Sequence, residues 1–169
     1  MSARIFKLCL LAVFCMYSAA PVQALEPGEG MPVIVGKTTE GSLFDLECIK
    51  GKVVLVDFWA SWCEPCKKSL PWMELIQSKY RAQGLQIIAV NLDEERRAAD
   101  TLLHELKIKE IMTLFDSHGE SAESFAVKAM PSTYLFDKAG KLVHMEAGYR
   151  ESKAKALELE IQKLVGATK

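Results

Sequence analysis

Two cysteines separated by two residues, Cys63 and Cys66, are the side chains of this sequence whose type and spacing suit redox chemistry. They follow an apolar run rich in β-branched and aromatic residues, Val53 to Trp59, which favours a strand buried on both faces. Apolar residues recur at helical spacing after them, so the cysteines lie where a strand leads into a helix. Unpaired backbone N–H groups and the helix dipole stabilise a thiolate there. The pattern therefore indicates that the two thiols can bridge each other and that Cys63 is the attacking sulfur.

The sequence WCEPCK, with Asp57 inside the preceding strand and Pro71 five residues beyond Cys66, resembles the active site of the thioredoxin fold. The Glu-Pro dipeptide, the two lysines after it and an apparent export signal are most similar to the TlpA and ResA group of extracytoplasmic thioredoxin-like reductases. The resemblance covers the chain from about Gly41 to the C-terminus. It implies an α/β fold, namely a thioredoxin-like three-layer sandwich with a central mixed sheet, an N-terminal hairpin and a central helix-strand insertion.

Cys66 and Asp57 are the expected partners of Cys63 in the reaction. Thiol–disulfide exchange needs a second thiol to resolve the mixed disulfide, and Cys66, one helical turn deeper, suits that role. Asp57 is an acid in an otherwise apolar strand, and an isolated buried carboxyl tends to stay protonated, which fits it to exchange a proton with Cys66. It matches the buried aspartate of thioredoxins, although Ala89 stands where a lysine often accompanies that acid.

The dipeptide between the cysteines is expected to tune the redox couple. The carboxylate of Glu64 raises the cost of forming the neighbouring thiolate, whereas a histidine would lower it, so we expect a reducing couple. Pro65 supplies no N–H and is well tolerated early in a helix. Ser69 departs from the TlpA and ResA pattern, because that group usually carries a glutamate three residues after the second cysteine.

Three further residues are expected to bind substrate. Met130-Pro131 matches the cis-proline of the thioredoxin fold that lies opposite the two cysteines, and the backbone before it would pair with an extended substrate segment. Trp62, beside Cys63, is expected to form an exposed apolar lip, whereas Trp59 is expected in the core.

Length and composition predict one exported domain. The 169 residues suit a single domain, and a net charge of −1 without a separate basic cluster makes nucleic acid an unexpected partner. Residues 1–24 resemble a secretory signal peptide, with a short positive region, an apolar run and small residues before a cut after Ala24. An uncleaved N-terminal anchor is the alternative. Residues 25–169 then form the thioredoxin-like domain, which faces the periplasm or another extracytoplasmic space.

Besides Cys63 and Cys66, residues 25–169 contain a third cysteine, Cys48, which has no second cysteine left to pair with. We expect it to be a small buried hydrophobic residue near the entry of the central strand, because free cysteine is among the most buried residue types. A third redox thiol or an intermolecular bridge is the alternative.

Hydrophobic periodicity predicts alternating strands and helices. An extended arm at 25–37 comes first, and Pro71 is expected to kink the helix after the cysteines. The expected strands are 41–46, 53–59, 85–90, 112–115, 130–137 and 142–147, and the expected helices follow Cys66 up to Gly84 and span 98–106, 121–128 and 151–165. The segment 93–124 resembles the central insertion of the TlpA group.

These observations predict an enzyme, a thiol-disulfide oxidoreductase that reduces disulfides of periplasmic proteins. The redox-active disulfide Cys63–Cys66 would be its only redox group, with no further cofactor and no metal. The resemblance implies disulfide-bearing client proteins, for example in cytochrome c biogenesis or metal-site assembly, and a membrane electron donor of the DsbD or CcdA type. We expect a monomer.

Three alternatives remain open at this point. A copper-binding metallochaperone would use Cys63, Cys66 and a distant histidine such as His144. A peroxiredoxin-like thiol peroxidase wants a threonine shortly before the reactive cysteine and a paired arginine, which Ser61 and Trp62 do not supply. A disulfide-forming oxidase is the third. A structural zinc site would need two more ligands, and the histidines of this chain are scattered.

Overall fold

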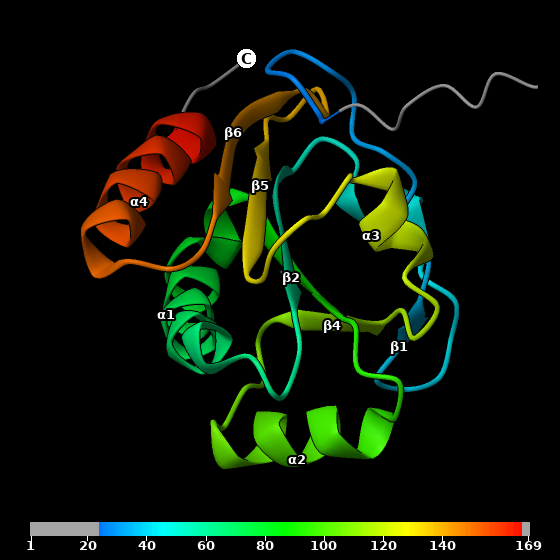
Figure 1. Cartoon of the computed structure of the whole chain (residues 1–169). Helices are drawn as coiled ribbons and strands as arrows, with labels where there is room; N and C mark the ends of the chain where they lie inside the picture. The colour runs from blue at the N-terminus through cyan, green and yellow to red at the C-terminus, as the bar shows by residue number, and fades with distance from the viewer. Residues whose placement is uncertain (1–23, 167–169) are drawn as a thin grey trace, which may run out of the picture.

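The computed structural model describes residues 24–166, which fold around a six-stranded mixed sheet (Figure 1). Its strands are β1 (Lys37–Thr38), β2 (Val53–Trp59), β3 (Leu85–Asn91), β4 (Met112–Phe115), β5 (Ser132–Phe136) and β6 (Leu142–Ala147). In space the order is β1-β4-β3-β2-β5-β6. Strands β2, β3 and β4 are parallel, and the pairs β2–β5, β5–β6 and β1–β4 are antiparallel.

Helices cover both faces of the sheet. They are α1 (Glu64–Tyr80), α2 (Arg96–Glu105), α3 (Glu120–Ser124) and α4 (Glu151–Gly166), with short 3₁₀ helices η1 (Leu46–Ile49) and η2 (Arg81–Gln83). Helices α1 and α4 lie on one face, and α3 lies on the other together with the N-terminal arm (Figure 1). The predicted three-layer thioredoxin-like fold is thus confirmed, including α2 and β4 as the central insertion. Within residues 24–166 no helix has both the length and the apolar character needed to cross a membrane.

Strand β2 determines which side chains reach each layer. Every residue of β2 is buried, and successive side chains of a strand point to opposite faces. Val53, Leu55 and Trp59 therefore pack in the core under α1 and α4. The intervening residues pack in the second core, beneath α3 and the arm. By the same alternation Asp57 belongs to the face that α1 covers.

Helix α1 begins directly after Cys63, which is its N-cap residue. Its buried stripe includes Cys66, Leu70 and Met73, spaced three or four residues apart, which anchors the helix on the sheet. The helix continues past Pro71 to Tyr80, four residues short of the expected end. The η2 turn fills that gap and ends at Gly84, whose φ of 95° suits glycine.

The predicted strand at 41–46 is wrong. Only Leu43 pairs there, in an isolated bridge to Lys37, and the N-terminal hairpin is reduced to this bridge and β1. Asp45 ends the extended segment because its carboxylate accepts a hydrogen bond from the Glu47 N–H and caps η1. Helix α3 is also shorter than expected, ending before Ala126, which has a φ of 53°.

Candidate active site

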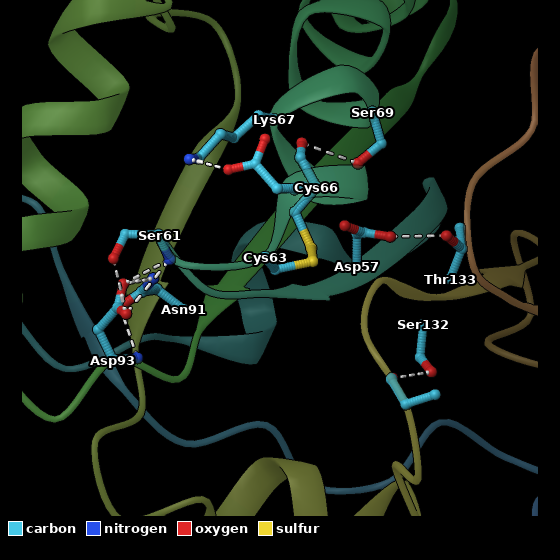
Figure 2. Close-up of a disulfide and its surroundings, with 12 residues drawn as sticks. Asp57, Ser61, Cys63, Cys66, Lys67, Ser69, Asn91, Asp93, Ser132 and Thr133 are labelled. Carbon is cyan, nitrogen blue, oxygen red and sulfur yellow. Dashed lines mark hydrogen bonds and ion pairs between the residues drawn. A yellow bond between two sulfur atoms is a disulfide. The ribbon is translucent and has the colours of Figure 1, made fainter.

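Cys63 and Cys66 form a disulfide at the first turn of α1 (Figure 2). Their Cα atoms lie 5.3 Å apart. Cys66 is fully buried, whereas Cys63 keeps about 5% of its surface exposed. The cysteines are therefore joined as expected, and the earlier of the two is the one that an outside thiol can reach.

Asp57 is fully buried on the face of β2 that α1 covers. Its Oδ1 accepts a hydrogen bond of 2.6 Å from the Thr133 hydroxyl, while its Oδ2 has no hydrogen-bond partner among residues 24–166. Ala89 lies beside it in register on β3, as expected from the sequence. Burial raises the pKa of this carboxyl to about 8, and the Thr133 hydrogen bond opposes that rise. At pH 7 the group is therefore mostly protonated.

The turn that precedes Cys63 is held by Asp93, which follows the end of β3. The Asp93 carboxylate accepts hydrogen bonds from the backbone N–H and the hydroxyl of Ser61, both at 2.9 Å, and one of 2.7 Å from the Asn91 amide (Figure 2). Sequence reasoning did not identify this role. A signal was present, because β2 and β3 are parallel and the ends of parallel strands meet at one edge.

Replacing Asp93 with alanine should lower the free energy of unfolding by about 1–3 kcal/mol, because the part-buried donors of Ser61 and the buried amide of Asn91 lose their acceptor. Urea unfolding of the oxidised protein measures this change. Asp100→Ala is the matched control, since Asp100 makes an exposed ion pair with Arg96 and its loss should cost less than about 1 kcal/mol. Equal losses in the two variants would contradict the anchoring role of Asp93.

The side chains expected to tune the Cys63–Cys66 redox couple differ in burial and in their contacts. Glu64 is exposed and makes an ion pair of 2.5 Å with Lys67, which partly offsets its charge near Cys63. Pro65 lies in the first turn of α1. Ser69 is buried, and its hydroxyl donates to the backbone carbonyl of Cys66 at 3.1 Å, so this position adds no charge beneath the disulfide.

The three residues expected to bind substrate are Trp62, Met130 and Pro131. Trp62 is 67% exposed and Trp59 is fully buried, as predicted. The Met130–Pro131 peptide bond is cis. Met130 is partly buried and packs against the core cluster that contains both cysteines. Their role in binding stays a prediction.

His144 is not brought to the cysteines. Its ring contacts the carboxylates of Glu160 and Glu146, at 3.1 and 3.8 Å. Across residues 24–166, no three His, Cys, Asp or Glu side chains are grouped so that they could hold a metal ion. The three-ligand copper site that the metallochaperone alternative requires is therefore not assembled.

Cys48 is exposed, and the prediction that it is buried is wrong. Helix η1 buries Ile49 instead, which turns the preceding side chain to solvent. Cys48 also precedes β2, whereas the disulfide follows it, and a strand of 7 residues rises roughly 20 Å. It is therefore too distant to act as a third thiol within the site. The predicted signal peptide, apart from Ala24, lies outside the described residues.

Comparisons with known proteins give one family match and several similar proteins. The Redoxin family model matches residues 26–159. The thiol-disulfide oxidoreductase ResA of Bacillus cereus is 32% identical over 142 residues, covering 84% of this chain and 80% of the relative, and ResA of Bacillus subtilis is 31% identical over 143 residues, covering 83% and 79%. Among solved structures, a putative thiol:disulfide interchange protein DsbE from Chlorobium tepidum matches with a TM-score of 0.80 and 37% identity, covering 85% of this chain and all of that one.

Proposed function

Because the chain belongs to the Redoxin family, and within it to the ResA-type thiol-disulfide oxidoreductases, we propose that it reduces disulfides of exported proteins. One observation carries this proposal: the disulfide lies at the first turn of α1, and Cys63, the sulfur nearer to solvent, follows the exposed Trp62. A client disulfide can therefore meet Cys63 while Cys66 waits beneath it.

In the proposed reaction the Cys63 thiolate attacks one sulfur of the client disulfide. The client's other sulfur leaves with the electron pair of the broken bond and takes a proton from solvent. Cys66 then loses its proton and attacks the Cys63 sulfur, which releases the second client sulfur as a thiolate. The client is reduced and the Cys63–Cys66 pair is oxidised. Asp57, buried beside the pair, exchanges the proton with Cys66.

The apolar surface of Trp62 would hold the client, and the backbone at Met130 would pair with an extended client segment. Pro131 has no N–H, so it adds no competing donor next to the sulfurs. The exposure of Trp62 and the packing of Met130 against the cysteine-containing core support this arrangement.

The reducing direction rests on the residues between the cysteines. Glu64 and Pro65 supply no cation to stabilise the Cys63 thiolate, and Lys67 is already engaged by Glu64. A reductase outside the cytoplasm needs electrons from across the membrane, so we propose a membrane donor of the DsbD or CcdA type. The domain would work in the periplasm or an equivalent space, on clients such as apocytochrome c during cytochrome c biogenesis or proteins that receive a metal site.

A redox titration of the Cys63–Cys66 couple tests the direction. We expect a midpoint nearer to that of thioredoxin, about −270 mV, than to that of DsbA, about −120 mV. Glu64→His is the control, because a cation beside Cys63 should stabilise the thiolate and make the couple more oxidising. A wild-type midpoint close to that of DsbA would show that the protein forms disulfides rather than reducing them.

A further inference from the structure

A row of polar side chains runs from Asp57 to the edge of the sheet. Asp57 pairs in register with Thr133 on β5, and Thr133 pairs with Glu146 on β6. Residues in register on adjacent strands share a face, so all three point toward the layer of α1 and α4. On the other side of Asp57, the residues in register are Ala89 on β3 and then Thr113 on β4. The apolar Ala89 interrupts the polar side chains on that side, so they continue from Asp57 without a break only toward the edge strand β6.

The two oxygens of the Asp57 carboxyl face different partners. Oδ1 accepts the 2.6 Å hydrogen bond from the Thr133 hydroxyl. Oδ2 is turned toward the Cys63–Cys66 disulfide (Figure 2). The carboxyl group thus lies between the disulfide and Thr133, with one oxygen available to each.

Thr133 also reaches a small cavity that Asp57 does not line. The cavity measures about 20 Å³. Its polar lining includes Thr133, Glu146 and Lys153, and the rest of its wall includes apolar side chains such as Trp72, Met73 and Leu157. A volume of roughly 10–15 Å³ is enough to hold one water molecule when polar groups surround it. Glu146 is mostly buried there and pairs with Lys153 of α4. The cavity at the outer end of the row is therefore large enough for one water molecule, and Thr133, Glu146 and Lys153 offer that water polar partners.

Ionising Asp57 would be costly at this position. A buried carboxylate needs a nearby cation or several donors, and within the described part of the chain Asp57 has a single donor, Thr133. Its register neighbour on β3 is Ala89, and the Cys63–Cys66 disulfide lies on its other side (Figure 2). Glu146 lies two strands away on the edge strand β6, and Lys153, which pairs with it, lies on α4. A route that moves a proton past Asp57 without ionising it would avoid this cost.

We propose that Asp57 and Thr133 form a proton relay between Cys66 and water in the cavity beside Glu146. This inference rests on the proposed thiol chemistry. When Cys66 attacks, its proton passes to Oδ2, the proton on Oδ1 passes to the Thr133 hydroxyl oxygen, and the proton of that hydroxyl passes to water. The electron pair of the former S–H bond forms the Cys63–Cys66 bond.

One proton has then moved from Cys66 to water, and the carboxyl has stayed neutral throughout. The relay ends with Thr133 donating to Oδ1, which is the hydrogen bond in the oxidised protein. Reduction of the disulfide runs the same transfers backward, so that Cys66 leaves as a protonated thiol. Thr133 is in this sense a positioning and relay residue rather than a group that touches the client.

Thr133→Val tests the relay, because valine keeps the branched shape and removes the hydroxyl. The measurement is the rate of single-turnover reduction of the Cys63–Cys66 disulfide by dithiothreitol. Tryptophan fluorescence reports the progress of this reduction. General acid–base assistance contributes typically 10²–10⁴-fold, and we expect this variant to be at least about tenfold slower. Thr133→Ser should stay within about twofold of wild type. The matched control is Thr113→Val, a buried threonine of the same row beyond Ala89, which should leave the rate unchanged.

The dependence of the rate on the D₂O fraction separates a relay from a structural role. When several protons move in the same transition state, the rate depends on the D₂O fraction along a curve, and we expect this for the wild type. For Thr133→Val the rate should fall linearly with the D₂O fraction. If the valine variant does not fold, Thr133→Ala removes the same hydroxyl. A Thr133→Val rate and curvature equal to those of wild type would overturn the relay. Insulin reduction is measured in parallel: a wild type that cannot reduce insulin refutes the proposed function, whereas slow Thr133→Val reduction by dithiothreitol supports the relay regardless.

Discussion

Cys63→Ser should abolish the reduction of insulin disulfides, by at least about a thousandfold, because a serine hydroxyl cannot replace the attacking thiolate. Cys66→Ser should behave differently. Its Cys63 thiol can still attack a client, but the mixed disulfide is not resolved, because the buried second thiol is missing. The first variant is therefore inactive, and the second stops after one attack with its client attached.

Turbidity of reduced insulin measures the loss of turnover, and non-reducing electrophoresis with mass spectrometry detects the trapped complex. Cys48→Ser is the control, because Cys48 is exposed at the opposite end of β2 from the disulfide and should leave turnover unchanged. Trapping by Cys63→Ser instead of Cys66→Ser would reverse the roles assigned to the two sulfurs. The same trapped complexes from the exported fraction of cells would identify the clients.

Asp57→Asn should make the protein more stable at pH 7 and slower in turnover. In the folded protein the pKa of Asp57 is about 8, against 3.8 for an ordinary aspartate. Between these values the folded state binds one proton more than the unfolded state, so stability falls by about 1.4 kcal/mol for each unit of rising pH. By pH 7 this loss is on the order of 4 kcal/mol. Asparagine does not titrate and avoids the loss.

The gain from Asp57→Asn therefore depends on pH. At pH 4 the variant should be the less stable protein, by about 1–3 kcal/mol, because the buried amide N–H groups are unpaired. At pH 7 the order should reverse. Urea unfolding at several pH values tests this crossover, and Asp100→Asn at the surface is the control. A stability difference that is independent of pH would contradict the raised pKa of Asp57.

The catalytic effect of Asp57→Asn is expected to be opposite to its effect on stability. An amide can still accept the hydrogen bond of Thr133, but it cannot take the proton of Cys66. Turnover at pH 7 should fall by about 10²-fold, the lower end of general acid–base effects. Turnover at pH 7 equal to that of the wild type would remove Asp57 from the mechanism.

The sequence by itself determined the features that depend on neighbouring residues. An apolar run before two cysteines indicates a central strand that leads into a helix, and this places Cys63 at the helix start. An acid within this otherwise apolar run marks Asp57 as a candidate for the mechanism, although the run does not specify which face of the sheet Asp57 occupies. These conclusions follow from the periods of strand and helix, which are local properties of the chain.

Only the tertiary structure decided the contacts between distant segments. Asp93 binds a turn 32 residues away and Thr133 binds an acid 76 residues away, because strand order and register bring them together. The same holds for Cys48, whose exposure depends on how η1 packs, and for the strand expected at 41–46, which Asp45 ends with a cap. Hydrophobic periodicity reports which side of an element is buried, but it does not encode which residue of another element lies opposite. The chemistry of the cysteines was therefore readable from the sequence, whereas the polar row that serves them required the fold.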